Sequence, residues 1–189
     1  MNPLVLVTSP AQTPIRYLLL VALILATVVD LKRRRIPNLI TFPTALFAFV
    51  LHGVYGGAAA VASSLLAFLM WFLFGFLFYR TVAGKEIGAG DIKLVMAISA
   101  CVGFLPAAYM TFISLVLAIA FLFVRWVLQG TAPANFSLLY RWAAATATSG
   151  TEKAHFRPVG MEDKTPHAPF LLAAALLSYW LYQRGLLLN

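Results

Sequence analysis

Acidic residues are scarce in this chain of 189 residues, in which six Asp and Glu stand against fourteen Lys and Arg. Charged residues make up 11% of the sequence and hydrophobic residues 62%, whereas a soluble domain carries about 25% charged residues. This composition excludes an ordinary soluble domain and predicts a protein that contacts a lipid bilayer. The net charge of +8 is explained by the gathering of basic residues in cytoplasmic loops, so no nucleic-acid partner is expected.

Cysteine is almost absent. Cys101, the one cysteine, lies in an apolar run, which excludes an internal disulfide and a paired-cysteine zinc motif. The three histidines, His52, His155 and His167, are far apart and lack the spacing of metal ligands. We therefore expect neither a metal nor another cofactor. Residues 1–14 lack the features of a signal peptide, so the first apolar run is predicted to be retained.

Long apolar runs predict the fold, because about 20 such residues cross a hydrocarbon core roughly 30 Å thick. The pattern predicts an all-α bundle of about six transmembrane helices. The first should end near Arg35, since Pro37 disfavours helix in the residue before it. Gly53, Gly56 and Gly57 should connect the second run to the third. The six runs cover residues 15–30, 39–55, 58–79, 91–103, 107–128 and 168–188.

Basic residues predict the orientation of this bundle. With the N-terminus outside, every Lys and Arg except Arg16 and Arg184 falls in a cytoplasmic segment, as the positive-inside rule requires. The outer connections around Gly56 and Pro106 carry no charge. We therefore expect one multi-pass, membrane-embedded domain over the whole chain. Segment 129–167 is predicted to be a cytoplasmic loop, and its aromatic residues are compatible with a short amphipathic helix on the membrane surface.

Two acidic residues, Asp30 and Asp91, adjoin predicted membrane helices, and an ionisable residue at that depth is a functional candidate. Both are expected at the cytoplasmic boundary. Two carboxylates that share a site divide the work: one removes a proton from water, while the protonated one polarises a carbonyl. Helix dipoles favour the carboxylate at Asp91 and the proton at Asp30. The charges of Arg33 and Arg34 favour the opposite assignment.

A structural interpretation of the same acids stays open. Asp30 could pair with a nearby arginine, and Asp91 could serve only as a helix cap. Gly88 and Gly90, just before Asp91, favour a site, because glycine lets the backbone approach a bound chain closely.

Three motifs resemble those of the type IV prepilin peptidases, membrane aspartyl proteases of the GxGD class. The first is DLKRRRIPN, which begins at Asp30, and the second is GAGDIK, residues 88–93. The third is PHAPF, residues 166–170, which resembles the segment that opens the last helix of the family. The compact form of the chain resembles the stand-alone peptidases of tight-adherence (Flp) pilus systems.

The resemblance implies that Asp30 and Asp91 are a catalytic pair that removes the leader of pilin-like precursors at the cytoplasmic face of the bacterial inner membrane. It implies substrate-positioning or structural roles for Gly88, Gly90, Lys93, Pro169 and Phe170. Lys93 could tune Asp91 or reach the lipid headgroups.

The sequence also departs from the family. Bifunctional members carry an N-terminal region with paired CxxC motifs and methylate the new terminus, so methyl transfer is not expected here. His167 and Ala168 stand where many members have Phe-Gly. A proton-coupled transporter or channel is the alternative function, although the chain shows no internal repeat. A catalytically idle assembly factor is a third interpretation, which the presence of both acids disfavours.

Overall fold

The computed structural model describes residues 13–78, 89–148 and 166–183, and within these ranges the chain forms helices and no strands. Three helices, α1, α2 and α4, are long and apolar enough to cross a membrane. The prediction of an all-helical membrane protein is confirmed at this level. The helices are α1 (Thr13–Arg33), α2 (Asn38–Phe78), α3 (Ala89–Val102), α4 (Phe104–Leu128), α5 (Ala132–Thr148) and α6 (Ala168–Gln183).

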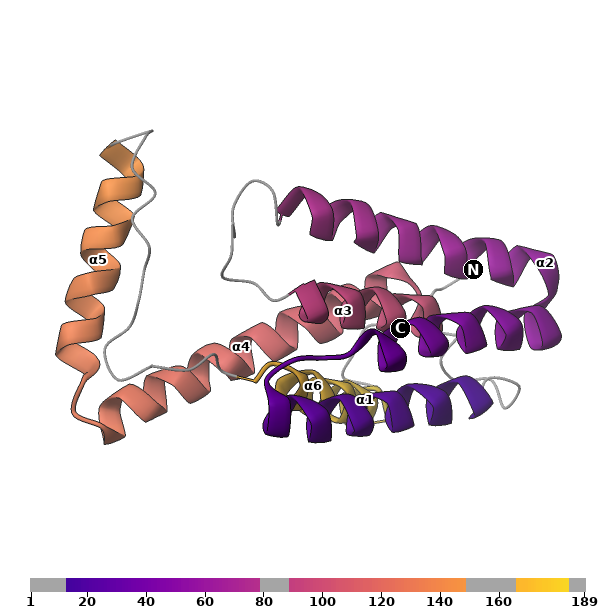
Figure 1. Ribbon diagram of the computed structural model, residues 1–189, viewed down its shortest axis with the longest axis horizontal. Coiled ribbons are helices and arrows are strands. Elements are labelled where there is room, and N and C mark those ends of the chain that lie inside the picture. Colours follow the sequence, from indigo (N-terminus) through magenta and orange to yellow (C-terminus); the bar gives the residue numbers. More distant parts are fainter. Residues whose placement is uncertain (1–12, 79–88, 149–165, 184–189) are drawn as a thin grey trace. The chain divides into compact units, whose positions relative to one another are not determined.

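Helix α2 is a hairpin of two arms that meet at Gly57 (Figure 1). The backbone of Gly57 has φ 68° and ψ −168°, a conformation that is open essentially to glycine alone. Across the hairpin, the rings of Phe49 and Phe68 lie 5.7 Å apart. The two arms correspond to the second and third predicted runs. Their connection is shorter than predicted, because one residue reverses the chain.

Two other helix boundaries differ from the prediction. Helix α1 ends at Arg33 rather than near Arg35, because Arg34 adopts a left-handed conformation with φ 51°. Helix α4 begins at Phe104, so Pro106 lies in its first turn and not in an outer connection. Proline is accommodated in the first turn of a helix, where the backbone N–H groups lack partners in any case.

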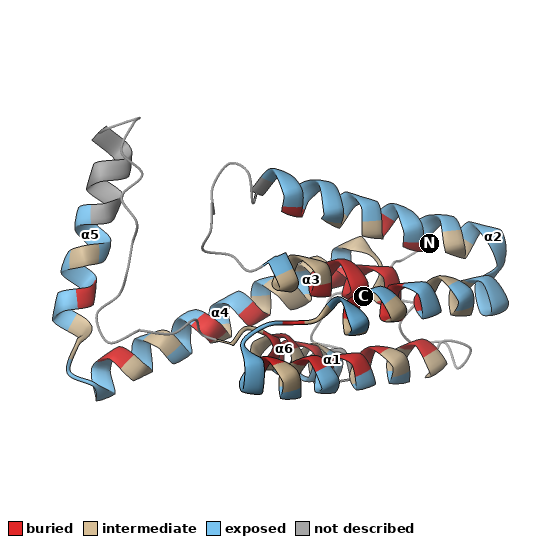
Figure 2. Ribbon diagram, in the orientation of Figure 1, coloured by how far each residue is buried: buried red, intermediate tan, exposed pale blue. Residues whose placement is uncertain are grey.

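The chain divides into two compact units, and the division falls within α4. The first unit contains residues 1–115 and 166–189. Its centre is α3, which is buried continuously from Leu94 to Cys101 and packs against α2, while α1 packs against α2 and α6. Figure 2 shows the buried residues concentrated along α3 and on α1 and α6.

Serine side chains join α2 to the second half of α3. The hydroxyl of Ser64 donates to the carbonyl oxygen of Ala100 at 2.5 Å. The hydroxyl of Ser99 donates to the carbonyl oxygen of Ala67 at 3.3 Å. Small polar residues allow helices to approach closely and hydrogen-bond in a membrane. These contacts hold the hairpin against α3.

The second unit, residues 116–165, contains the end of α4 and helix α5. The Phe136 ring on α5 lies 6.0 Å from the Phe123 ring and 6.2 Å from the Trp126 ring, both on α4. The buried Asn135 donates to the hydroxyl of Thr131 at 3.3 Å. Segment 129–167 thus contains a helix. Its place on a cytoplasmic membrane surface stays a prediction.

Candidate active site

Asp30 lies in the last turn of α1 and is buried, with 4% of its surface exposed. Its Oδ2 accepts a hydrogen bond of 3.0 Å from the backbone N–H of Ala168, the first residue of α6. Within the described ranges, no other hydrogen bond and no ion pair reaches this carboxylate. The described structure therefore does not show the arginine pairing considered above. The hydrogen bond between Ala168 and Asp30 instead joins the third motif to the first.

The contact with α6 changes the electrostatic setting of Asp30. The first N–H groups of a helix have no partner within that helix, and they stabilise negative charge together with the helix dipole. The sequence shows only that Asp30 is near the C-terminus of its own helix, where the dipole favours a proton. The structure adds the opposite influence from the N-terminus of α6. Helix dipoles alone therefore do not separate the roles of Asp30 and Asp91.

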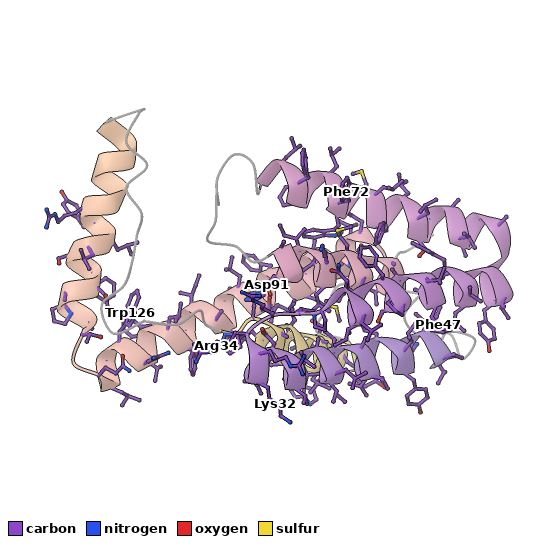
Figure 3. All side chains as sticks on the ribbon, in the orientation of Figure 1. Lys32, Arg34, Phe47, Phe72, Asp91 and Trp126 are labelled. Carbon is purple, nitrogen blue, oxygen red and sulfur yellow. The ribbon has the colours of Figure 1, made fainter. Side chains whose placement is uncertain are left out.

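Asp91 is half-buried in the first turn of α3, where Figure 3 labels it. Because α3 begins at Ala89, Asp91 lies inside the helix and is not the residue that precedes it. The helix therefore supports negative charge at Asp91 through its dipole.

Gly90 brings the second motif against the first. A methyl group on Gly90 would lie 3.2 Å from the Cβ of Ile36 and 3.3 Å from its backbone nitrogen and oxygen. The buried Ile36 belongs to the connection between α1 and α2, shortly after Asp30. A side chain at position 90 would therefore press against the backbone of Ile36. Gly88, the other glycine predicted to matter, lies outside the described residues.

Lys93 makes a second connection between these motifs. Its ammonium group donates to Oδ1 of Asn38 at 2.9 Å and lies 6.0 Å from the centre of the Phe42 ring, within the range of a cation–π interaction. Asn38 is part of the first motif, but no pattern in the sequence predicts its partner. The described contacts of Lys93 therefore tie the start of α3 to the start of α2.

The third motif forms the entry to α6. Pro169 and Phe170 are half-buried in the first turn, and the N–H of Phe170 donates to the carbonyl of His167 at 3.1 Å. The rings of His167 and Phe170 lie 6.4 Å apart. Substrate positioning by Pro169 and Phe170 stays a prediction.

His167 was not predicted as part of the site, and the sequence offers no periodic signal that would place it there. Burial lowers the pKa of its imidazole below the ordinary value, while the Coulombic attraction of Asp30 acts in the opposite direction.

All three motifs thus meet at one end of the first unit, where α1 ends and α3 and α6 begin (Figure 1). In the described ranges, no group of three or more His, Cys, Asp or Glu could hold a metal ion. The first unit is therefore a bundle of apolar helices with two acidic residues, Asp30 and Asp91, at one end. This arrangement is that of a helical membrane protein with an ionisable site.

Comparison with known families gives the class of that site. The model of the type IV leader peptidase family matches residues 17–123, more than half of the chain. The chain belongs to this family, and it is a membrane protein of the leader peptidase type. Searches of curated proteins and of solved structures gave no match. The matched range contains the first two motifs and ends before the third.

Proposed function

We propose that the protein is an aspartyl endopeptidase of the bacterial inner membrane that removes the leader from pilin-like precursors. Asp30 and Asp91 are its catalytic pair, and peptide cleavage is the activity assigned. The contact of Gly90 with Ile36 is the observation that carries this proposal. It brings together the two chain segments that contain the acids, which are far apart in the sequence.

The proposed topology has six spans, with the N-terminus outside and the acids at the cytoplasmic boundary. The two arms of α2 supply two spans, and α1, α3, α4 and α6 supply the others. Basic residues 32–35 begin two positions after Asp30 and support a cytoplasmic position for the site. In α3, the short fourth span, Asp91 lies in the first turn. A short span draws its ends toward the lipid or thins the bilayer.

The pair would share one proton, because two carboxylates in one site do not both ionise readily. The ionised acid removes a proton from water, and the resulting nucleophile attacks the scissile carbonyl. The protonated acid donates a hydrogen bond to the oxygen of that carbonyl. The N–H of Ala168 donates to Oδ2 of Asp30. We therefore assign the proton transfer to the other carboxylate oxygen, Oδ1. The proposal does not depend on which acid carries the shared proton.

The test uses Asp30→Asn and Asp91→Asn, which preserve the size of each side chain and remove its charge. Each variant should lose at least about 1,000-fold in cleavage rate, because removing one member disables a pair that acts as a unit. Thermal unfolding in detergent should show that both variants still fold.

Cleavage is measured by co-expression with pilin-like precursors, followed by mobility shift and N-terminal sequencing of the product. Glu162→Gln, in the 129–167 segment, is the matched control and should cleave at the normal rate. A variant at Asp30 or Asp91 that processes precursor normally would remove that residue from the mechanism.

A further inference from the structure

We propose that Gly75, on the second arm of α2, is a positioning residue of the active site. Because glycine has no side chain, Ile92 of α3 fits against this position, and the contact fixes the place of the neighbouring Asp91. The inference rests on the proposed function of Asp91. It gives a role to a residue outside the three motifs and adds the second arm of α2 to the elements that build the site.

The contact between Gly75 and Ile92 leaves no room for a side chain at position 75. Gly75 is buried. A Cβ added to it would overlap Cγ2 of Ile92 and would lie 3.6 Å from Cβ and 3.7 Å from Cγ1 of the same residue. The Ile92 side chain cannot turn away freely, because branching at Cβ leaves one strongly preferred χ1 rotamer in a helix. An added methyl group would therefore displace the helix backbone on one side of the contact.

This contact acts on Asp91 through the helix backbone. Asp91 and Ile92 are consecutive residues in the first turn of α3. Consecutive residues of an α-helix are related by a rise of about 1.5 Å and a rotation of about 100°, so a displaced Ile92 carries Asp91 with it. The same rotation makes the two side chains point in different directions. The packing against α2 therefore uses Ile92 and leaves Asp91 pointing elsewhere.

A contact on the other side of α3 prevents the start of this helix from moving away. Gly90 and Ile92 are two residues apart, so they lie about 200° apart around the helix axis and face nearly opposite sides. On the first side, a methyl group on Gly90 would lie 3.2 Å from Cβ of Ile36, so little space remains there. On the second side, Ile92 meets Gly75. The start of α3 is thus held between the connection after α1 and the second arm of α2, with Asp91 between the two contact residues.

The expected result is a loss of rate that depends on the residue at position 92. Gly75→Ala should lower kcat for precursor cleavage about tenfold, because small displacements of catalytic groups are costly, and should change KM less than about twofold. In the Ile92→Ala background, the same substitution should lower kcat by less than about twofold. The two methyl groups would then lie 3.6 Å apart, which is an ordinary van der Waals distance. A double-mutant cycle measures this coupling.

The rates are compared per folded molecule, with folding followed by thermal unfolding in detergent. Alanine is a better helix former than glycine, so Gly75→Ala does not weaken α2 itself. A purely structural role would reduce the amount of folded protein and leave kcat per folded molecule unchanged. Gly53→Ala is the matched control: its methyl group would meet Cγ2 of Val61 at 3.3 Å within the α2 hairpin, and its kcat should not change. Unchanged kcat in Gly75→Ala, or an equal loss with Ile and with Ala at position 92, would overturn the proposal.

A second measurement does not depend on cleavage. When Gly75→Cys is combined with Ile92→Cys, the two Cβ atoms would lie 3.6 Å apart, within the range of about 3.5–4.5 Å found in disulfides. Mild oxidation of the full chain in detergent should join them. Mass spectrometry after thiol alkylation should then find one free thiol, that of Cys101. Cys101 lies nine residues beyond Ile92 on α3, about 13 Å along the helix, which is too far to compete for the bond.

The matched control for the cross-link combines Leu73→Cys with Ile92→Cys. Leu73 is exposed on the same arm and faces nearly opposite to Gly75, so this pair should stay reduced. A pair at positions 75 and 92 that forms no bond, or equal cross-linking of both pairs, would overturn the proposal. An unchanged protein that cleaves no precursor would instead refute the proposed function, and the cross-link would still decide whether the second arm of α2 meets the start of α3.

Discussion

The two ends of α3 differ in what surrounds them. At its start, Asp91 and Lys93 are half-buried, and Gly90 touches the connection after α1. Toward its end, Ser99 and Ala100 are fully buried. The hydroxyl of Ser99 donates to the carbonyl of Ala67 on α2, and the carbonyl of Ala100 accepts from Ser64. The buried end contains uncharged groups with partners inside the protein, whereas the start contains groups that change charge. Substitutions at the start should therefore alter activity, and substitutions toward the end should alter stability.

Apart from the two acids, the largest effect is expected at Gly90, where added atoms would press against Ile36. Gly90→Val should lower the cleavage rate about 100-fold and Gly90→Ala about tenfold, because small displacements of catalytic groups are costly. Gly53→Ala is the matched control, since its methyl group would meet Val61 at a similar 3.3 Å within the α2 hairpin. Equal losses of activity in Gly53→Ala and Gly90→Ala would break the comparison.

An intermediate effect is expected at Ser64, whose hydroxyl binds the carbonyl of Ala100. Ser64→Ala should lower the free energy of unfolding by about 1 kcal/mol, in the range of interhelical hydrogen bonds in membranes. The cleavage rate per folded molecule should not change. Thermal unfolding in detergent measures the first quantity. The adjacent Ser63 is exposed, so Ser63→Ala should leave stability unaltered. If Ser64→Ala lost activity but kept its stability, the contrast between the start of α3, which affects activity, and its end, which affects stability, would be wrong.

The smallest effect is expected at Lys93. Lys93→Met removes the hydrogen bond to Asn38 and should slow cleavage about threefold, because Asn38 and the hydrogen bond itself are exposed. The measurement is a double-mutant cycle with Asn38→Ala. If the contact positions the start of α3, the double variant should be no slower than Lys93→Met alone. Fully additive losses would show that the two side chains act separately.

Much of the fold follows from local features of the sequence. Apolar length predicts α1, both arms of α2 and α4. Proline and glycine predict where helices meet, but with errors of a few residues. Gly57 alone reverses the chain, and the left-handed backbone of Arg34 ends α1 before Pro37 could. Such choices between neighbouring residues depend on tertiary packing, which no local pattern contains.

The site was less accessible from the sequence. Span lengths predict a depth for the two acids, but no feature of the sequence predicts the partner of Asp30. Ala168 is 138 positions away, and its N–H donor belongs to the backbone, so no side-chain pattern indicates it. His167 enters the site through the same contact. Lys93 and Asn38 were both within recognised motifs, yet their pairing required the packing of α3 on α2.

The single-residue turn at Gly57 bears on how the chain reaches the lipid during synthesis. A single residue separates the two arms, so almost no chain lies between the end of the first arm and the start of the second. Under the proposed topology, both arms enter together as a preformed pair, with the tip leading. Ser64, whose hydroxyl bonds the backbone of α3, would then be in place on the hairpin before α3 is synthesised.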